Sequence, residues 1–108
     1  MLNASFVYIL TNKTRKLLYI GVTSDLRLRL YQHKHEIFPE SFTARYKIKY
    51  LIYYEIIDGI ENAIDREKQL KRWSRIKKEI IIAEKNKNWK FLNREIENDI
   101  YSLDSADD

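Results

Sequence analysis

The chain has 108 residues, contains no cysteine and carries a net charge of +4. The length fits one domain, and 44% hydrophobic with 13% aromatic residues favours a folded core over disorder. Without cysteine, the sequence excludes disulfides, thiolate metal sites and a thiol nucleophile. The charge is uneven, because residues 1–98 hold all 20 Lys and Arg against 12 acids, a surplus of +8. Such a basic body favours a polyanionic partner, although many small proteins carry this surplus for solubility.

The sequence shows no sign of export or membrane insertion. The N-terminus lacks the basic stretch, apolar run and small-residue cleavage site of a secretory signal. The longest apolar stretch, residues 50–57, is interrupted by Glu55 and is too short to span a bilayer. We therefore expect a cytoplasmic protein without a membrane partner.

Two short strands, residues 6–10 and 18–22, open the chain. The polar loop between them contains two turn formers and predicts an antiparallel hairpin centred between Lys13 and Thr14. On this register, the numbers of directly facing residues sum to 27.

The predicted hairpin brings two tyrosines together. Tyr8 faces Tyr19, and the two phenols share one face of the sheet. Val7 and Ile9 point to the other face, which we expect to be the core. Tyrosine pairs across strands commonly do no more than stabilise a sheet. Gly21 is more informative, because glycine inside a strand usually marks a bulge or a close approach by another backbone or a ligand.

A basic helix of about residues 26–35 follows, with three candidate N-caps at residues 23–25. Arg29 and His33 are four residues apart and stack on one flank of this helix. Alone, each is ordinarily a solvated or packed side chain. Together they could bind a phosphate, because arginine offers a planar fork of donors and histidine a donor or proton shuttle.

The rest of the chain alternates one strand with helices. The pattern predicts an α+β fold in which a small three-stranded mixed sheet is flanked by helices in the order ββα-β-α-α. We expect the catalytic groups to gather on one face of this sheet. The predicted elements are a linker over 36–48, a strand over 50–57, and helices over 60–73, over 75–86 with Ser74 as cap, and from Asn88 onward.

An acidic residue interrupts the apolar face of the helix over 60–73. Glu67 lies within about 20° of the apolar stripe on the helical wheel. It could simply extend its carboxylate to the surface and pair with Lys71 or Arg66. It could instead bind a hard divalent cation at the edge of the sheet. The stripe consists of Ile60, Ala63, Ile64 and Leu70.

Three stretches in this order and spacing resemble the GIY-YIG nuclease superfamily, also called the URI domain. They are residues 19–34, which begin Tyr-Ile-Gly, residues 41–46 (Ser-Phe-Thr-Ala-Arg-Tyr) and residues 63–73. The likeness is to the small stand-alone bacterial branch related to the N-terminal nuclease domain of the incising subunit of the excision-repair system. It implies a nuclease domain over 1–92, followed over 93–108 by a helical extension and an acidic tail that we expect to be disordered.

The chain departs from the family pattern at two places. The first motif, Gly-Ile-Tyr in the family name, is Phe6-Val7-Tyr8 here, and only its tyrosine carries chemistry. Many members also place a structuring asparagine about a dozen residues after the metal-binding glutamate. Here position 79 is Glu79, and Asn86 and Asn88 follow later.

The resemblance implies five catalytic residues and one cation. Glu67 would hold Mg²⁺ or Mn²⁺, and Arg29 would bind the phosphate oxygens. Tyr8 would act as general base on the attacking water, directly or through a relay. Tyr19 would orient the water or the phosphate, and His33 would assist proton transfer or position the backbone.

These features predict a metal-dependent DNA endonuclease or exonuclease in repair or recombination. The alternatives are a non-catalytic nucleic-acid-binding module within a larger complex, and a toxin or mobile-element nuclease component. Specificity would follow DNA structure, single-stranded or a structured duplex, or a partner protein. A basic run is more often just a solvated face, but beside a phosphate-cleaving site it suits contact with the DNA backbone. Phe42 or Tyr46 could stack on a base. The basic residues expected to contact DNA are Arg45, Lys68, Lys71, Arg72, Arg75 and Lys78, with Lys47, Lys49 and Lys77 nearby.

Overall fold

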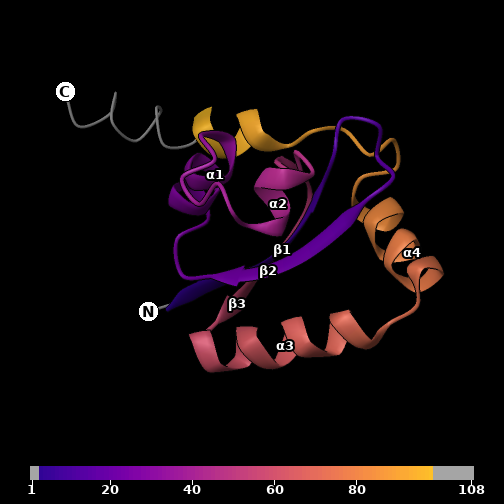
Figure 1. Cartoon of the computed structure of the whole chain (residues 1–108). Helices are drawn as coiled ribbons and strands as arrows, with labels where there is room; N and C mark the ends of the chain where they lie inside the picture. The colour runs from indigo at the N-terminus through magenta and orange to yellow at the C-terminus, as the bar shows by residue number, and fades with distance from the viewer. Residues whose placement is uncertain (1–2, 99–108) are drawn as a thin grey trace.

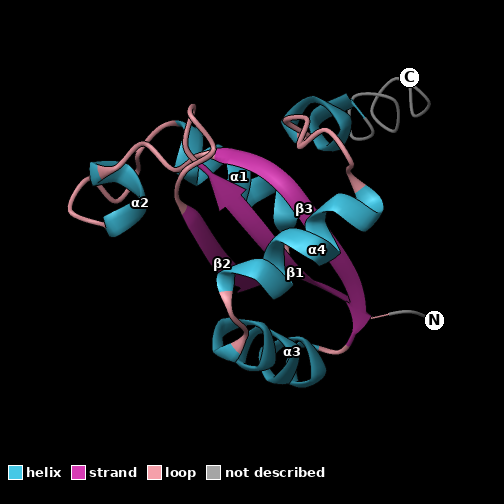
Figure 2. Cartoon of the chain, turned by 90° about the vertical axis from the view of Figure 1, so that its right-hand side faces the viewer, coloured by secondary structure: helices cyan, strands magenta, loops and turns pink. Residues whose placement is uncertain are grey.

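The computed structural model describes residues 3–98 and consists of a three-stranded sheet with helices on both faces (Figures 1 and 2). The sheet order is β2-β1-β3, and both strand pairs are antiparallel. The predicted α+β class is confirmed, whereas the predicted mixed sheet is wrong because central β1 runs against both neighbours. The elements are β1 (Ala4–Thr11), β2 (Leu18–Thr23), α1 (Leu26–Lys34), α2 (Phe42–Arg45), β3 (Tyr50–Asp58), α3 (Ile60–Arg72) and α4 (Arg75–Lys85).

The hairpin register differs from the predicted one by two residues. Tyr8 faces Gly21, so the numbers of facing residues sum to 29 rather than 27. The turn is centred between Thr14 and Arg15, one residue later than predicted, because the Asn12 side chain accepts hydrogen bonds from the backbone N–H groups of residues 16–17 and holds both outside β2. An even shift leaves each side chain on its predicted face, so Tyr8 and Tyr19 still share one face.

Apolar side chains are buried on both faces of the sheet, not only on the predicted face of Val7 and Ile9. Helices α3 and α4 cover that face, and α1 covers the face of Tyr8 and Leu10 (Figure 2). The second core exists because α1 returns over the hairpin that precedes it. The helices contribute Ala63 and Leu70 from α3, Ile82 from α4, and Leu26 and Leu30 from α1.

Side-chain caps begin three of the helices. Asp25 accepts a hydrogen bond from the backbone N–H of Leu28 at α1, and Ser74 accepts one from Lys77 at α4. Ser74 was predicted as a cap from the sequence, and Asp25 was one of three candidates for the cap of α1. Ser41 caps α2, a single helical turn inside the stretch predicted as a linker. One turn of helix is too short to show apolar periodicity.

The chain after α4 covers the outer edge of β3. Buried Asn86 donates from Nδ2 to the carbonyl of Ile52 at 2.9 Å. The backbone N–H of Leu92 donates to the carbonyl of Leu51 at 2.7 Å, and Asn93 Oδ1 accepts from the backbone N–H of Leu51 at 2.8 Å. The Asn93 amide nitrogen also donates to the backbone carbonyl at position 49. These bonds occupy the positions that a neighbouring strand would take.

The last helix begins later than predicted. Residues 93–98 are helical, whereas Trp89 has a φ of 53°, which a right-handed helix cannot include. The predicted helix start at Asn88 is therefore wrong. The acidic tail, residues 102–108, lies outside the described residues. Within residues 3–98, no helix has the length and apolar character needed to cross a membrane.

Candidate active site

The Tyr8 ring has no exposed surface and crosses the backbone of Gly21 on the edge strand β2. A Cβ atom at position 21 would lie 2.8 Å from Tyr8 Cε2, and closer still to Cζ and the hydroxyl oxygen. The glycine therefore marks a close approach, and the approaching group is a side chain. Its missing Cβ lets the phenol lean over β2 toward α1.

A series of hydrogen bonds links the Tyr8 hydroxyl to α1 and α2. Tyr8 Oη is 3.3 Å from His33 Nε2, and His33 Nδ1 is 3.2 Å from Thr43 Oγ1. Thr43 Oγ1 is 3.2 Å from Ser41 Oγ, which also accepts the capping N–H bond of α2. The rings of Tyr8 and Tyr19 each meet the His33 ring edge-on, with centroids 6.0 Å apart. The sheet, α1 and α2 therefore converge on His33.

Arg29 lies one turn before His33 and acts on both neighbouring rings. Burial raises the pKa of Tyr8 to about 12, and the adjacent Arg29 guanidinium offsets part of that rise. Burial, together with the positive charge of Arg29, lowers the pKa of His33 to about 4. Tyr8 and His33 are consequently both neutral at pH 7. The site combines one fixed positive charge with a neutral phenol and a neutral imidazole.

Glu67 comes from α3, which packs on the opposite face of the sheet from α1, so helices on both faces supply the predicted catalytic residues. That their reactive groups gather on one face stays a prediction. The apolar stripe of α3 packs on the face of Val7 and Ile9 through Ala63 and Leu70. The Glu67 carboxylate forms an ion pair with Lys71 at 3.3 Å. Burial is the main cause that raises the pKa of Tyr8, and the negative charge of Glu67 is one of the smaller ones, so the carboxylate lies within electrostatic reach of Tyr8.

The described residues contain no cluster of three or more His, Asp or Glu side chains able to hold a metal ion. Arg66, the other predicted partner of Glu67, binds Glu55 of β3 instead. Any cation at Glu67 would therefore depend on one carboxylate, on water and on its substrate.

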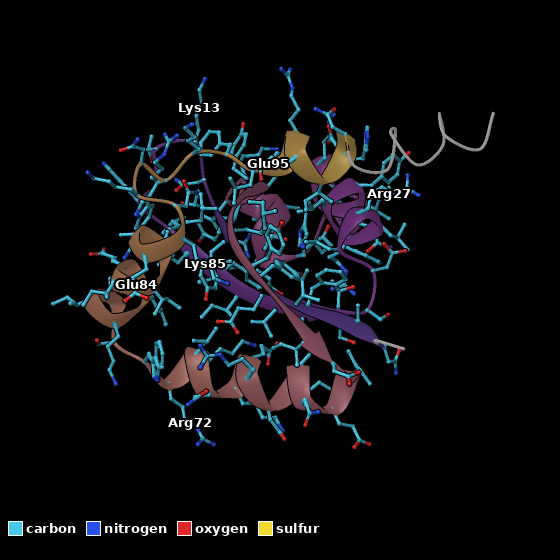
Figure 3. The ribbon with its side chains drawn as sticks, turned by 180° about the vertical axis from the view of Figure 1, so that it is seen from behind. Lys13, Arg27, Arg72, Glu84, Lys85 and Glu95 are labelled. Atoms are coloured by element: carbon cyan, nitrogen blue, oxygen red, sulfur yellow. The ribbon has the colours of Figure 1, made fainter. Side chains whose placement is uncertain are left out.

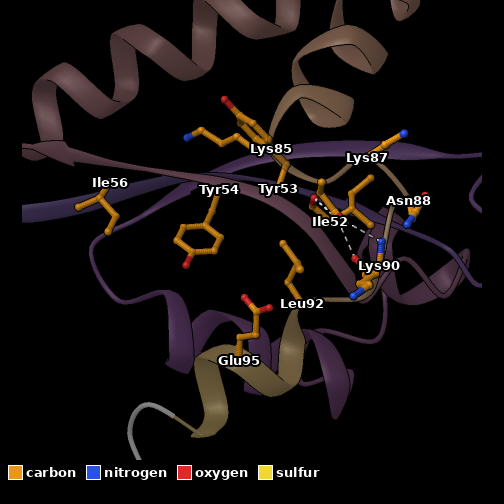
Figure 4. Close-up of a pocket in the computed structure, with 11 residues that line it drawn as sticks. Ile52, Tyr53, Tyr54, Ile56, Lys85, Lys87, Asn88, Lys90, Leu92 and Glu95 are labelled. Atoms are coloured by element: carbon orange, nitrogen blue, oxygen red, sulfur yellow. Dashed lines mark hydrogen bonds between the residues drawn. The ribbon is translucent and has the colours of Figure 1, made fainter.

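A hollow of about 780 Å³ lies at the other edge of the sheet, along β3 and the segment 85–95 (Figure 4). None of the five predicted catalytic residues lines it. The residues that converge on His33 lie instead beside β2, at the opposite edge of the sheet from this hollow.

Comparison with known proteins identifies the family. The sequence model of the GIY-YIG catalytic domain matches residues 4–80. The chain belongs to the GIY-YIG family. A UPF0213 protein of Syntrophus aciditrophicus (strain SB) is 30% identical over 77 residues, which cover 71% of this chain and 87% of that protein. The solution NMR structure of a UPF0213 protein from Bacillus halodurans matches 80% of this chain and 89% of its own, with a TM-score of 0.50 and 27% identity.

The family assignment confirms the predicted resemblance, including the branch of small stand-alone bacterial proteins. GIY-YIG proteins are nucleases, so the assignment also indicates a nucleic acid as substrate. The individual roles of Tyr8, Tyr19, Arg29, His33 and Glu67 stay predictions.

Two of the predicted DNA contacts in this GIY-YIG protein have partners of their own. Arg75 binds Glu79 Oε2 at 2.9 Å and the backbone carbonyl of Lys16 at 2.7 Å, so it joins α4 to the loop of the hairpin. Lys71 is the partner of Glu67. Both bases must exchange a protein partner for a phosphate if they are to contact DNA.

Lys47 and Lys49 also have a partner, because both form ion pairs with Glu36. The end of α3 is more open, and Arg72 points away from the body of the protein there (Figure 3). Within the described part of the chain, the predicted contacts that make no ion pair or side-chain hydrogen bond are Arg45, Lys68, Arg72, Lys77 and Lys78.

Sequence reasoning assigned no role to Thr43 or Ser41, although both lie in a stretch that carries the family resemblance. Thr43 is buried and is the partner of His33 Nδ1. The available signal was the pair of hydroxyl residues flanking Phe42, but only the fold shows that one of them meets a histidine ten residues away. Asn86, which could not be aligned from sequence, makes the structuring bonds at the edge of β3.

His33 is expected to remain neutral until the pH approaches about 4. Histidine in an unfolded chain titrates near pH 6.5, so the unfolded state binds more protons between about pH 4 and 6.5. The free energy of unfolding should therefore fall as the pH drops through this window. Titration of the histidine ring protons by NMR measures the pKa directly, and the His35→Gln variant assigns the second resonance. A midpoint near 6.5 for His33 would contradict the buried, Arg29-adjacent position.

Proposed function

We propose that this GIY-YIG protein is a divalent-metal-dependent DNA nuclease that hydrolyses phosphodiester bonds in repair or recombination. The observation that carries the proposal is the convergence of Tyr8, Arg29 and His33 beside β2, in a chain of this family. Phosphodiester hydrolysis requires a positive group to bind the phosphate, here the Arg29 guanidinium, and groups that move a proton, here the neutral Tyr8 and His33 side chains.

Arg29 is the group proposed to bind the scissile phosphate. Its side chain is half-buried, and it is positioned by α1, whose start the Asp25 cap fixes. A guanidinium presents a planar fork of donors to two phosphate oxygens. Negative charge grows on those oxygens as water attacks phosphorus, so a positive charge held in place stabilises the transition state more than the ground state.

Tyr8 is proposed to take the proton of the attacking water. A neutral phenol with a pKa of about 12 can do so only if it passes its own proton on, and His33 Nε2 lies 3.3 Å away to accept it. His33 must then carry its ring hydrogen on Nδ1 and donate it to Thr43 Oγ1, which the 3.2 Å contact supports. In this step the water O–H bond breaks and its proton passes to Tyr8 as the Tyr8 proton passes to His33 Nε2. A bond forms between the water oxygen and phosphorus, the bond to the leaving oxygen breaks, the leaving oxygen takes a proton from solvent, and His33 releases its extra proton to solvent.

Glu67 fits a hard divalent cation. Its side chain is 15% exposed, whereas the side chain of its partner Lys71 is 53% exposed and free to turn its ammonium group into water. Mg²⁺ characteristically binds through one or two carboxylates, several waters and substrate phosphates. When bound, Mg²⁺ or Mn²⁺ would polarise the phosphate as a Lewis acid. Tyr19 is proposed to orient the water or the phosphate beside His33.

The Glu67→Gln variant tests the proposal. We expect the wild type to cut labelled single-stranded, duplex, nicked or flapped DNA with Mg²⁺ or Mn²⁺ and not with EDTA. Glu67→Gln keeps the shape of the side chain and should lower the rate by at least about a hundredfold, the scale on which one preorganised electrostatic group acts. Gel analysis of end-labelled products measures both rates.

Glu79→Gln is the matched control. It removes another glutamate from an i,i+4 ion pair, with Arg75 on α4, and leaves the residues around His33 untouched. Its rate should stay within about twofold of the wild type, because an exposed ion pair contributes little. A folded wild type that binds DNA but cuts none would overturn the nuclease proposal. It would favour a nucleic-acid-binding module in a larger complex instead.

A further inference from the structure

Two aromatic rings on α2 face solvent beside the site. Phe42 is 53% exposed and Tyr46 is 48% exposed, and their ring centroids are 4.8 Å apart. Arg45 lies between them in sequence, with its guanidinium 5.9 Å from the Tyr46 ring centroid. We call Phe42, Arg45 and Tyr46 the aromatic platform. Grouped aromatic side chains on a small surface helix indicate an interaction site rather than a stable resting surface.

The platform is held firmly by the other half of the same helix. Thr43 and Ala44 are buried, and the Thr43 carbonyl accepts a bond of 2.8 Å from the backbone N–H of Ile48. Lys47 ends the helix in the left-handed region, with a φ of 55°. The rings are therefore presented by a turn whose inner side is fixed.

The same turn joins the platform to the chemistry. Thr43 follows Phe42 directly and bonds His33 Nδ1, which is one hydrogen bond from the Tyr8 hydroxyl. No flexible linker separates the exposed rings from the proposed phosphate site. A strand that has its phosphate at Arg29 would therefore have a neighbouring nucleotide within reach of α2.

We propose that the aromatic platform stacks unpaired bases of a DNA strand next to the scissile phosphate. Every base has a π-face, so stacking on Phe42 and Tyr46 would tolerate any sequence. Bases in a duplex already stack on each other, which makes the platform selective for single-stranded segments. Arg45 adds a positive charge for the backbone, and residues 34–49 hold four Lys and Arg against two acids. The position of the cleaved phosphate in this inference rests on the proposed function, but the predicted binding of single strands does not depend on cleavage.

Binding measurements in EDTA test the platform without any cleavage. Fluorescence anisotropy with labelled single-stranded and duplex DNA would compare the wild type with Phe42→Ala and Tyr46→Ala. Each substitution should weaken single-strand binding by about tenfold, within the range measured for base–aromatic stacking, and duplex binding by less than about threefold. Tyr46→Phe keeps the ring and should bind like the wild type.

Tyr31→Ala is the matched control, because Tyr31 is 56% exposed and its ring contacts His35 rather than the platform. Two residues correspond to about 200° of helix, so it lies on the far side of α1 from His33. Its removal should leave single-strand binding unchanged. An equal loss in Tyr31→Ala would overturn the assignment of binding to α2.

An abasic scan gives a second readout. A single abasic nucleotide is moved along the strand, and at one position it should weaken wild-type binding as much as Phe42→Ala does. The Phe42→Ala variant should then bind the abasic strand no more weakly than either change alone predicts, because both changes remove the same contact. Additive losses at every position would overturn direct stacking, even if both variants bind weakly for other reasons.

The outcomes separate this inference from the nuclease proposal. If the wild type cuts nothing but its single-strand binding depends on Phe42 and Tyr46, the platform stands and the nuclease proposal fails. If the protein cuts single-stranded and duplex DNA in the same ratio with and without the rings, the platform fails and the nuclease stands. If the protein binds single-stranded RNA of the same sequence more tightly than the DNA, the proposal of a DNA platform is overturned. It is also overturned if the protein is a dimer that Phe42→Ala dissociates without loss of strand binding, because the rings would then form a dimer interface.

Discussion

Gly21→Ala is expected to lower the cleavage rate strongly and to destabilise the fold, although it adds only one methyl group. The new Cβ would occupy space that the Tyr8 ring fills, 2.8 Å from Cε2 and closer to Cζ and Oη. The ring is wholly buried in the core between the sheet and α1, so it can yield to the new methyl group only by displacing its neighbours. Overpacking of this kind costs about 1–3 kcal/mol of stability. A displacement of Tyr8 Oη by about 1 Å would also lower the cleavage rate by about a hundredfold.

Gly59→Ala is the control for this substitution. Gly59 has a φ of 89°, so alanine there is strained, but its Cβ would meet only Asn62 Nδ2 at 3.6 Å. Gly59→Ala should therefore lower stability without changing cleavage by the folded fraction. Thermal unfolding and cleavage rates, measured on both variants at a temperature where each is folded, separate the two effects. A fully active Gly21→Ala protein would contradict the position of Tyr8 over β2.

Arg29→Ala should lower the cleavage rate by about 100- to 1,000-fold, the range for losing one electrostatic donor to a transition state. Arg29→Lys should recover part of the rate, because lysine keeps the charge but loses the planar fork. The substitution should also act on its neighbours. Arg29 lowers the pKa of both Tyr8 and His33, so its removal raises both.

His33 supplies a readout of Arg29 that does not depend on cleavage. Burial is the main cause that lowers the pKa of His33, and the positive charge of Arg29 is the second. The NMR midpoint of His33 should therefore rise from about 4 in Arg29→Ala. Arg27→Ala is the control, since Arg27 is exposed on the same helix. It should change neither the midpoint nor the rate. An unchanged His33 midpoint in Arg29→Ala would show that the guanidinium lies elsewhere.

The elements of the fold were predictable because their signals are local. Helix α1 was predicted from three candidate caps, among them Asp25, and α4 from its Ser74 cap, and both helices begin at the predicted residues. The hairpin register was not predictable, because it depends on how the Asn12 side chain binds two amides beyond the turn. The late start of the last helix depends in the same way on the left-handed backbone of Trp89.

The candidate site was predictable in its members but not in its arrangement. Tyr8, Arg29 and His33 stood out because two strands and one helix bring them together over a short stretch of sequence. That the pKa of Tyr8 is raised and that of His33 lowered follows from burial on a second sheet face, which the sequence pattern did not show. The partnership of His33 with Thr43 depends on α2, which is too short to predict.

The Asn93 side chain is a peptide group in miniature. Its carbonyl accepts from the backbone N–H of Leu51, and its amide donates to the carbonyl of Lys49, as the backbone of a fourth strand would. An open strand edge is a template on which other chains can add and aggregate. The GIY-YIG match ends at residue 80, so the residues that close this edge lie outside the catalytic family domain. In this protein the β3 edge is therefore closed by residues beyond the part of the chain that the family model matches.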